Sequence, residues 1–429
     1  MENFIVKGSV NLRGKVKISG SKNSAVAILP AAVLTPETVY LDNLPEITDV
    51  RTMITILENL GVSVRRRGRN SLELTPANLN KIAPSYELVK KMRASYYFMG
   101  SLLARFGRAE VPIPGGCDLG PRPIDQHLKG FTALGAEINI EQGMIYLSAE
   151  KLTGAHIYLD VVSIGATINL MLAASAAEGR TVLENVAKEP EIVDLANFLN
   201  AIGVRVRGAG TDVIRIDGTK KFSSARHAII PDRIEAGTFM LAAAATRGDV
   251  LVEDVIPKHL EAITAKLKEI GAKVNVEPER INVKVTDPLS PSDLKTFPYP
   301  GFPTDLQPPG MVLLTGANGL SVITENVFDG RYNQVDELKR MGAKIKVEGR
   351  TALIEGGNSL SGAPISVPDL RSGAALIIAA MMADGESRIS DVEHIDRGYE
   401  NFEQKLIQLG ASIKRVSGDS EVRLSGSQE

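Results

Sequence analysis

The chain has 429 residues, of which 44% are hydrophobic and 23% are charged, and its formal net charge is −2. This composition is typical of a soluble, folded protein with two or three domains. The nearly balanced charge argues against nucleic acid as the main partner, because binding to a phosphate backbone requires a strong excess of basic residues.

Two features of the chain argue against membrane insertion and secretion. The longest strongly apolar run near the C-terminal end, 374–383, is far too short to span a bilayer. The first residues lack the basic and apolar regions of a secretory signal. Because a lone cysteine also agrees with a reducing compartment, we expect a cytoplasmic protein.

The first predicted helix begins after Gly20-Ser21-Lys22-Asn23-Ser24 and continues into the apolar run 25–29. Polar capping residues and a lysine at a helix start suit a bound carboxylate or phosphate, but an ordinary capped helix has the same residues. Arg93, Arg371 and Arg397 lie near comparable junctions. Single arginines are usually solvated, whereas several together would fit a heavily anionic ligand.

An apolar residue followed by glycine recurs six times along the chain. These glycines are Gly61, Gly135, Gly203, Gly271, Gly342 and Gly410. They are separated by 74, 68, 68, 71 and 68 residues, a regularity that indicates six copies of one unit of about 70 residues.

Each unit is predicted to contain two helices and several strands. In the fourth, one helical face consists of Leu260, Ile263, Leu267 and Ile270. Gly271 then fits a left-handed helix terminator, and 272–276 alternates as a half-buried strand would. The second helix is rich in small residues, is expected to be buried, and is expected to end at glycine, as in 166–179, 236–248 and 374–385.

Cys117 is the only cysteine, and it lies in the segment 114–123 among three prolines and three glycines. These neighbours predict an exposed, turning backbone rather than a core position. Arg122 is close enough in sequence to favour a thiolate. The residues around Cys117 favour a chemical role for its thiol. The alternative, that Cys117 is an ordinary loop residue, remains open.

Acidic residues at element starts are further candidates. Composition alone favours helix caps for Asp305 and Asp369, and caps or surface ion pairs for 189–191 and 232–235. The five histidines lack metal-ligand spacing, and the common nucleotide-binding and zinc motifs are absent, so no metal is expected.

Several motifs occur in one order along the chain. They are Gly20-Ser21-Lys22-Asn23, Met92-Arg93-Ala94-Ser95, Pro114-Gly115-Gly116-Cys117, Gly120-Pro121-Arg122-Pro123, Glu189-Pro190-Glu191-Ile192-Val193-Asp194, Pro231-Asp232-Arg233-Ile234-Glu235, Pro303-Thr304-Asp305, Asp369-Leu370-Arg371 and His394-Ile395-Asp396-Arg397-Gly398-Tyr399. Over essentially its full length the chain therefore resembles the UDP-N-acetylglucosamine 1-carboxyvinyltransferases, a family of enolpyruvyl transferases.

The resemblance implies an α/β fold, a two-domain inside-out α/β barrel built from six βαβαββ repeats, three per domain. The first domain would span 22–229 and carry the Cys117 loop. The second would combine 1–21 with 230–429, and the active site would lie in the cleft between them.

The reaction that the resemblance implies moves enolpyruvyl from phosphoenolpyruvate to the 3'-hydroxyl of UDP-N-acetylglucosamine and releases phosphate. It is the first committed step of peptidoglycan synthesis and proceeds by addition and elimination through a tetrahedral ketal. The implied partners are these two small molecules, without a metal or an organic cofactor.

The resemblance also implies residue roles. The catalytic set would be Cys117 as proton donor, Asp305 as base, Lys22, Asp369 and Arg397. The donor would be held by Lys22, Arg122 and Arg397, with Arg93 and Arg371 nearby, and Asn23 would orient the reacting centre. The nucleotide and sugar would lie near Arg122, Pro123, Ile124, Asp125, Gln126, Ser163, Ile164 and Val327.

Three alternatives remain at this point. The related 5-enolpyruvylshikimate-3-phosphate synthases share the fold and the donor. RNA 3'-terminal phosphate cyclases use a related repeat, although the absence of a basic stripe counts against nucleic-acid end processing. An inactive repeat protein with a regulatory role is the third.

Overall fold

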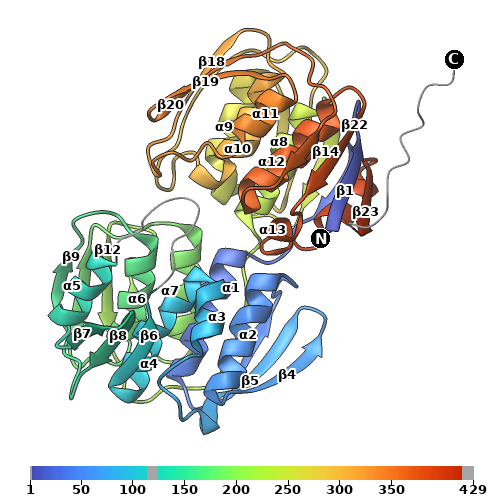
Figure 1. The fold of residues 1–429 in the computed structure, drawn as a ribbon. Helices are drawn as coiled ribbons and strands as arrows, with labels where there is room; N and C mark the ends of the chain where they lie inside the picture. The colour runs from blue at the N-terminus through green and yellow to red at the C-terminus, as the bar shows by residue number, and fades with distance from the viewer. Residues whose placement is uncertain (1, 114–123, 418–429) are drawn as a thin grey trace, which may run out of the picture.

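The protein's computed structural model describes residues 2–113 and 124–417, which form two lobes (Figure 1). The buried apolar side chains form two separate clusters. The cluster of the first lobe draws its residues from 25–229, and that of the second lobe from 4–18 together with 234–413. Each lobe therefore has its own hydrophobic core.

The elements of the first lobe are α1 (Lys22–Ala31), η1 (Ala32–Leu34), β3 (Val39–Asp42), α2 (Thr48–Leu60), β4 (Ser63–Gly68), β5 (Ser71–Thr75), η2 (Pro76–Asn78), α3 (Tyr86–Lys91), η3 (Arg93–Tyr97), α4 (Phe98–Phe106), β6 (Arg108–Pro112), α5 (Asp125–Ala133), β7 (Glu137–Glu141), β8 (Met144–Ser148), β9 (His156–Tyr158), α6 (Ile164–Ala174), β10 (Arg180–Glu184), α7 (Pro190–Ala201), β11 (Arg205–Arg207), β12 (Val213–Asp217) and β13 (Ala225–Ala228).

The elements of the second lobe are β1 (Glu2–Lys7), β2 (Arg13–Lys17), α8 (Arg233–Ala245), β14 (Asp249–Glu253), η4 (Pro257–Leu260), α9 (Glu261–Ile270), β15 (Lys273–Glu277), β16 (Arg280–Lys284), β17 (Asp293–Lys295), η5 (Thr304–Leu306), α10 (Gln307–Thr315), β18 (Leu320–Thr324), α11 (Val335–Arg340), β19 (Lys344–Glu348), β20 (Thr351–Glu355), β21 (Pro364–Ser366), α12 (Leu370–Met382), β22 (Glu386–Ser390), α13 (Glu393–Asp396), α14 (Phe402–Gln408) and β23 (Ser412–Ser417).

The repeated unit is clearest between β17 and β20. Its helices and strands follow in the order β17, α10, β18, α11, β19 and β20, which is βαβαββ. β17 pairs with β18 in parallel, and β20 pairs antiparallel with both β18 and β19. The described residues form six small sheets, three in each lobe. Five have four strands, and the sheet β6-β8-β7 has three. This arrangement confirms the predicted α/β fold of six repeats.

The helices rich in small residues lie inside the lobes, as predicted. Nearly every residue of α6, α8 and α12 is buried, and α8, α10 and α12 pack against one another. The sheets cover these helices with one face, because alternate residues are buried in strands such as β14. Among the described helices, none combines the length and the apolar character needed to cross a membrane.

The six repeated glycines all have positive φ angles, between 93° and 108°, which confirms the predicted left-handed helix ends. Two details of the prediction were wrong. α6, α8 and α12 stop short of Gly179, Gly248 and Gly385; Gly179 and Gly385 instead have positive φ just before the next strand. Val276 is 44% exposed rather than half-buried, because β15 lies at a sheet edge and pairs only with β16.

The N-terminal strands complete sheets of the second lobe. β1 lies between β22 and β23, as Figure 1 shows, and β2 pairs with β14. The chain then enters the first lobe next to the point where it returns. There the Ser21 amide donates to the carbonyl of Ile230 at 2.7 Å, and Gly20 forms a bridge with Pro231. Two neighbouring segments therefore connect the lobes.

Candidate active site

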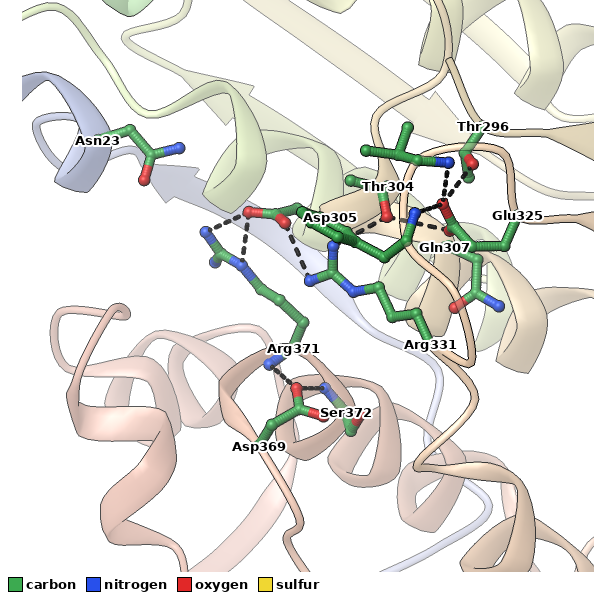
Figure 2. Close-up of polar contacts among 12 residues, drawn as sticks. Asn23, Thr296, Thr304, Asp305, Gln307, Glu325, Arg331, Asp369, Arg371 and Ser372 are labelled. Carbon is green, nitrogen blue, oxygen red and sulfur yellow. Dashed lines mark hydrogen bonds and ion pairs between the residues drawn. The ribbon is translucent and has the colours of Figure 1, made fainter. Parts of the chain in front are cut away.

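Asp305 lies between two buried arginines (Figure 2). Its Oδ2 is 3.0 Å from Nη2 of Arg371 and its Oδ1 is 2.9 Å from Nη2 of Arg331, and both arginine side chains are 5% exposed. Burial alone would raise the pKa of Asp305, but Arg371 and Arg331 outweigh burial and hold that pKa well below its usual range. Asp305 is therefore ionised at neutral pH.

The two arginines carry more positive charge than Asp305 neutralises. Nη1 of Arg371 and Nε of Arg331 are buried and have no hydrogen-bond partner among the described residues. Buried donors without partners are costly, and arginine forks match carboxylate and phosphate groups. The arrangement therefore suits a further anionic group beside Asp305.

Asp369 positions Arg371 by capping its helix. Its Oδ1 accepts hydrogen bonds from the amides of Arg371 at 2.9 Å and Ser372 at 3.0 Å. Its Oδ2 accepts from the Ser372 hydroxyl at 2.7 Å and from Asn333 at 3.3 Å. The cap predicted for Asp369 is confirmed, and it fixes the first turn of α12, from which Arg371 reaches Asp305. The cap favoured for Asp305 is wrong, because its carboxylate pairs with two arginines and caps neither η5 nor α10.

A second carboxylate joins Lys22 to Arg397. Oδ2 of Asp49 is 2.8 Å from Nζ of Lys22, and its Oδ1 is 3.1 Å from Nε of Arg397. Asp49 is buried in the first turn of α2; burial would raise its pKa, but Lys22 and Arg397 outweigh burial and lower it. This ion pair links α1 and α2 of the first lobe to the loop after α13 of the second.

The start of α1 is a capped helix whose backbone amides are largely occupied. Ser21 caps it by accepting from the Ser24 amide at 3.3 Å, and the Lys22 amide donates to Oδ2 of Asp232 at 2.9 Å. Asp232 also caps α8, because its Oδ1 accepts from the amides of residues 234 and 235 at 2.7 and 2.9 Å. The Lys22 side chain, rather than these amides, is what α1 can present to an anion.

The acidic segment 189–191 does not form the surface ion pair that we considered. Glu191 is buried, and its Oε1 accepts from Nδ2 of Asn23 at 3.2 Å and from Nη2 of Arg233 at 3.4 Å. The Arg233 side chain is only 10% exposed, and its guanidinium carbon lies 5.7 Å from the centroid of the Tyr299 ring. The sequence shows that Glu191 and Arg233 are charged, but it does not show that the two lobes bury them.

The residues expected near the nucleotide lie partly together. Ser163 caps α6, which begins at Ile164, by accepting from the amide of residue 166 at 3.2 Å. Gln126, in the first turn of α5, accepts from the Asp160 amide at 2.9 Å and thus ties the start of α5, including 124–125, to the segment before α6. Val327 lies in the second lobe, and no described contact joins it to these residues.

Cys117, Arg122 and Pro123 lie outside the described residues, so the structure does not place them. Arg93 begins η3, and its positive charge acts on His127. Sequence reasoning missed Asp49, Arg331 and Glu325, a buried carboxylate that follows β18. None of them belongs to a motif that indicates an active site, and Asp49 carries only the weak signal of an acid in a helix's first turn.

His127 is a buried, neutral histidine rather than a metal ligand. Asn169 donates its amide hydrogens to the Tyr96 carbonyl at 3.2 Å and to Nδ1 of His127 at 3.0 Å, so Nδ1 accepts. Burial, reinforced by Arg93, lowers the pKa of His127 to about 4. In residues 2–113 and 124–417 no group of three or more His, Cys, Asp or Glu residues could hold a metal ion.

This buried histidine makes the first lobe sensitive to mild acid. Because the pKa falls from an unfolded value of 6.5 to about 4, stabilisation is complete above pH 6.5 and is lost as pH falls toward 4. Lowering the pH from 7 to 5 should therefore cost about 2 kcal/mol of unfolding free energy through this residue. We expect the unfolding free energy of His127→Gln, measured with urea at pH 7 and pH 5, to fall by about 2 kcal/mol less than that of the unaltered protein. An equal fall in the variant and in the unaltered protein would contradict this role of His127.

Comparisons with known proteins agree on one family. A family model described as EPSP synthase (3-phosphoshikimate 1-carboxyvinyltransferase) matches residues 6–406. One similar relative is UDP-N-acetylglucosamine 1-carboxyvinyltransferase 3 of Caldanaerobacter subterraneus subsp. tengcongensis, which is 56% identical over 97% of this chain and 100% of the relative. Another is UDP-N-acetylglucosamine 1-carboxyvinyltransferase 2 of Geobacillus kaustophilus, which is 55% identical over 97% of each chain. A third, from Clostridium botulinum, is 52% identical over 97% of this chain and all of the relative.

Solved structures of lower identity share the fold. The enolpyruvyl transferase NikO from Streptomyces tendae superposes with a TM-score of 0.88 at 23% identity, over 96% of this chain and 98% of that one. EPSP synthase from Acinetobacter baumannii gives a TM-score of 0.73 at 19% identity, over 97% and 100%. At these identities the two structures support the fold alone and carry no argument about the substrate.

Proposed function

The chain belongs to the UDP-N-acetylglucosamine 1-carboxyvinyltransferases of the enolpyruvyl transferase family, and from this membership we propose how its residues carry the reaction. The enzyme transfers enolpyruvyl from phosphoenolpyruvate to UDP-N-acetylglucosamine, a reaction of peptidoglycan synthesis. The observation that carries this function is identity of 52–56% over 97% of the chain with relatives of that activity. The same relatives favour the sugar nucleotide over shikimate 3-phosphate as acceptor.

Phosphoenolpyruvate would bind among the cations that now surround Asp49 and Asp305. Its phosphate and carboxylate require several donors, which we assign to Lys22, Arg122 and Arg397, with Arg93 and Arg371 nearby. Lys22 and Arg397 come from different lobes and already meet at Asp49. A bound anion between them would hold the lobes together.

Asp305 is our candidate for the base that takes the proton of the 3'-hydroxyl. It is ionised before substrate binds, because Arg371 and Arg331 lower its pKa. The same pairing makes it a weak base in the free enzyme. An anionic donor that neutralises these arginines would raise the basicity of Asp305 when the acceptor is in place.

The remaining steps follow from the chemistry of the donor. Protonation of C3 by Cys117 would create positive charge at C2, and the sugar oxygen would attack there to give a tetrahedral ketal. Loss of a C3 proton and of phosphate would then restore the double bond. We assign no metal or organic cofactor to these steps, and Asn23 and Asp369 would orient the groups around them.

We further propose that the domains are 22–229, which carries the Cys117 loop, and 1–21 with 230–429, so that the active site lies between them. The two separate cores and the paired crossings at 20–21 and 230–231 support this division. We also place the enzyme in the cytoplasm, away from nucleic acid and without membrane insertion. The lone cysteine and the net charge of −2 support this assignment.

The role of Cys117 can be tested with fosfomycin, an alkylating epoxide that mimics the donor. We expect the drug to add to the sulfur of Cys117 and to inactivate the enzyme, because a thiolate near Arg122 would open the epoxide. Cys117→Asp should keep an acidic group yet resist labelling. Peptide mass spectrometry that finds no adduct on Cys117 in an inactivated sample would remove the thiol from the donor site.

A further inference from the structure

Glu325 is a fully buried carboxylate that joins three chain segments. It follows β18, and its side chain is 0% exposed. Oε1 accepts hydrogen bonds from the Thr296 hydroxyl at 2.7 Å, the Val327 amide at 2.8 Å and the Phe328 amide at 3.1 Å, and Oε2 accepts from the Thr304 hydroxyl at 3.0 Å. No lysine or arginine of the described residues forms an ion pair with it, so hydrogen bonds alone compensate its burial.

The Thr304 hydroxyl connects this carboxylate to Asp305. A hydroxyl has one proton, and Thr304 gives it to Glu325, because its other close partner, the Arg331 guanidinium, can only donate. Its oxygen is then free to accept from Nη1 of Arg331 at 2.9 Å. Nη2 of the same guanidinium holds Oδ1 of Asp305 at 2.9 Å. Figure 2 shows this series from Glu325 through Thr304 and Arg331 to Asp305.

The other oxygen of Glu325 fixes a different part of the site. It binds the amide of Val327, a residue that we assign to the acceptor substrate. The Glu325 carboxylate thus holds the turn that contains Val327. Through Thr304 it also holds the Arg331 guanidinium, which orients Asp305. An apolar residue could fill the same volume at a lower desolvation cost, but it could not fix both groups.

We propose that Glu325 is a positioning residue for the acceptor step, and that it acts through Thr304 and Arg331 on Asp305. The inference rests on the proposed role of Asp305 as base. Small displacements of reacting groups have large kinetic effects, so loss of this link should lower kcat by about 10- to 100-fold.

Three substitutions test the link. Thr304→Val removes the hydroxyl at nearly constant volume, and Thr304→Ser restores it. Glu325→Gln can keep the acceptor for Thr296 and the two amides but presents a donor to Thr304, which reverses that hydrogen bond. We expect Thr304→Val and Glu325→Gln to lower kcat about 10- to 100-fold, and Thr304→Ser to recover most of the turnover. Thermal unfolding of each variant checks that the protein compared is folded at the assay temperature.

The decisive readout repeats Thr304→Val in the Asp305→Asn background. If the hydroxyl acts through Asp305, kcat should change less than about twofold there, since interacting residues are not additive. An equal loss in both backgrounds, or no difference between Thr304→Val and Thr304→Ser, would overturn the inference and leave Glu325 a structural anchor. Normal turnover by Asp305→Asn alone would instead remove the base assignment and, with it, this inference. If Glu325→Gln fails to fold, the comparison of Thr304→Val with Thr304→Ser tests the inference on its own.

Discussion

Asp305→Asn is expected to lower kcat by about 1,000-fold while UDP-N-acetylglucosamine still binds with nearly normal affinity. The amide keeps the size of the side chain but cannot accept a proton from the 3'-hydroxyl. The loss should appear in kcat rather than in KM, because proton transfer belongs to the transition state.

The substitution also leaves Arg331 and Arg371 without their buried counter-ion, so its effect on folding must be measured beside its effect on turnover. Thermal unfolding with bound substrates provides that check. Asp287→Asn, in an exposed position, is the matched control and should behave as the unaltered enzyme. A kcat within tenfold of normal for Asp305→Asn would show that another group is the base.

Lys22→Met should lower kcat/KM for phosphoenolpyruvate by about 100-fold, the second large effect that we expect. Methionine keeps the length of the side chain but removes a charge-assisted contact to the donor, which is worth about 1.5–3 kcal/mol. Asp49 would also lose one of its two cations. Affinity for UDP-N-acetylglucosamine should change far less.

Lys258→Met is the control for general charge effects, because Lys258 is exposed and pairs only locally with Glu261. Steady-state kinetics over a range of phosphoenolpyruvate concentrations separates the two variants. If Lys22→Met and Lys258→Met give the same kcat/KM, Lys22 does not bind the donor.

Local features of the fold could be predicted from the sequence because they depend on neighbouring residues. Gly271 ends its helix at positive φ, and Asp369 and Asp232 cap the helices that follow them. Regular glycine spacing was sufficient to predict six repeated units. Exposure at a sheet edge, as for Val276, depends on strand order and could not be read from alternation.

The site was harder to predict because distant segments assemble it. Asp49 meets Arg397 across 348 residues, and neither Asp49 nor Arg331 stands in a recognisable motif. The ion pair between Glu191 and Arg233 was considered a surface pair for the same reason. Burial by a second lobe does not change the residues next to Glu191 in the sequence. The roles of Lys22 and Asp305 came from resemblance rather than from spacing, and they stay predictions until the variants are measured.

The most direct test of the proposed activity is phosphate release from phosphoenolpyruvate, measured with UDP-N-acetylglucosamine in one reaction and shikimate 3-phosphate in another. We predict release with the sugar nucleotide and none above background with shikimate 3-phosphate. Release only with shikimate 3-phosphate, or with neither acceptor, would contradict the assigned reaction.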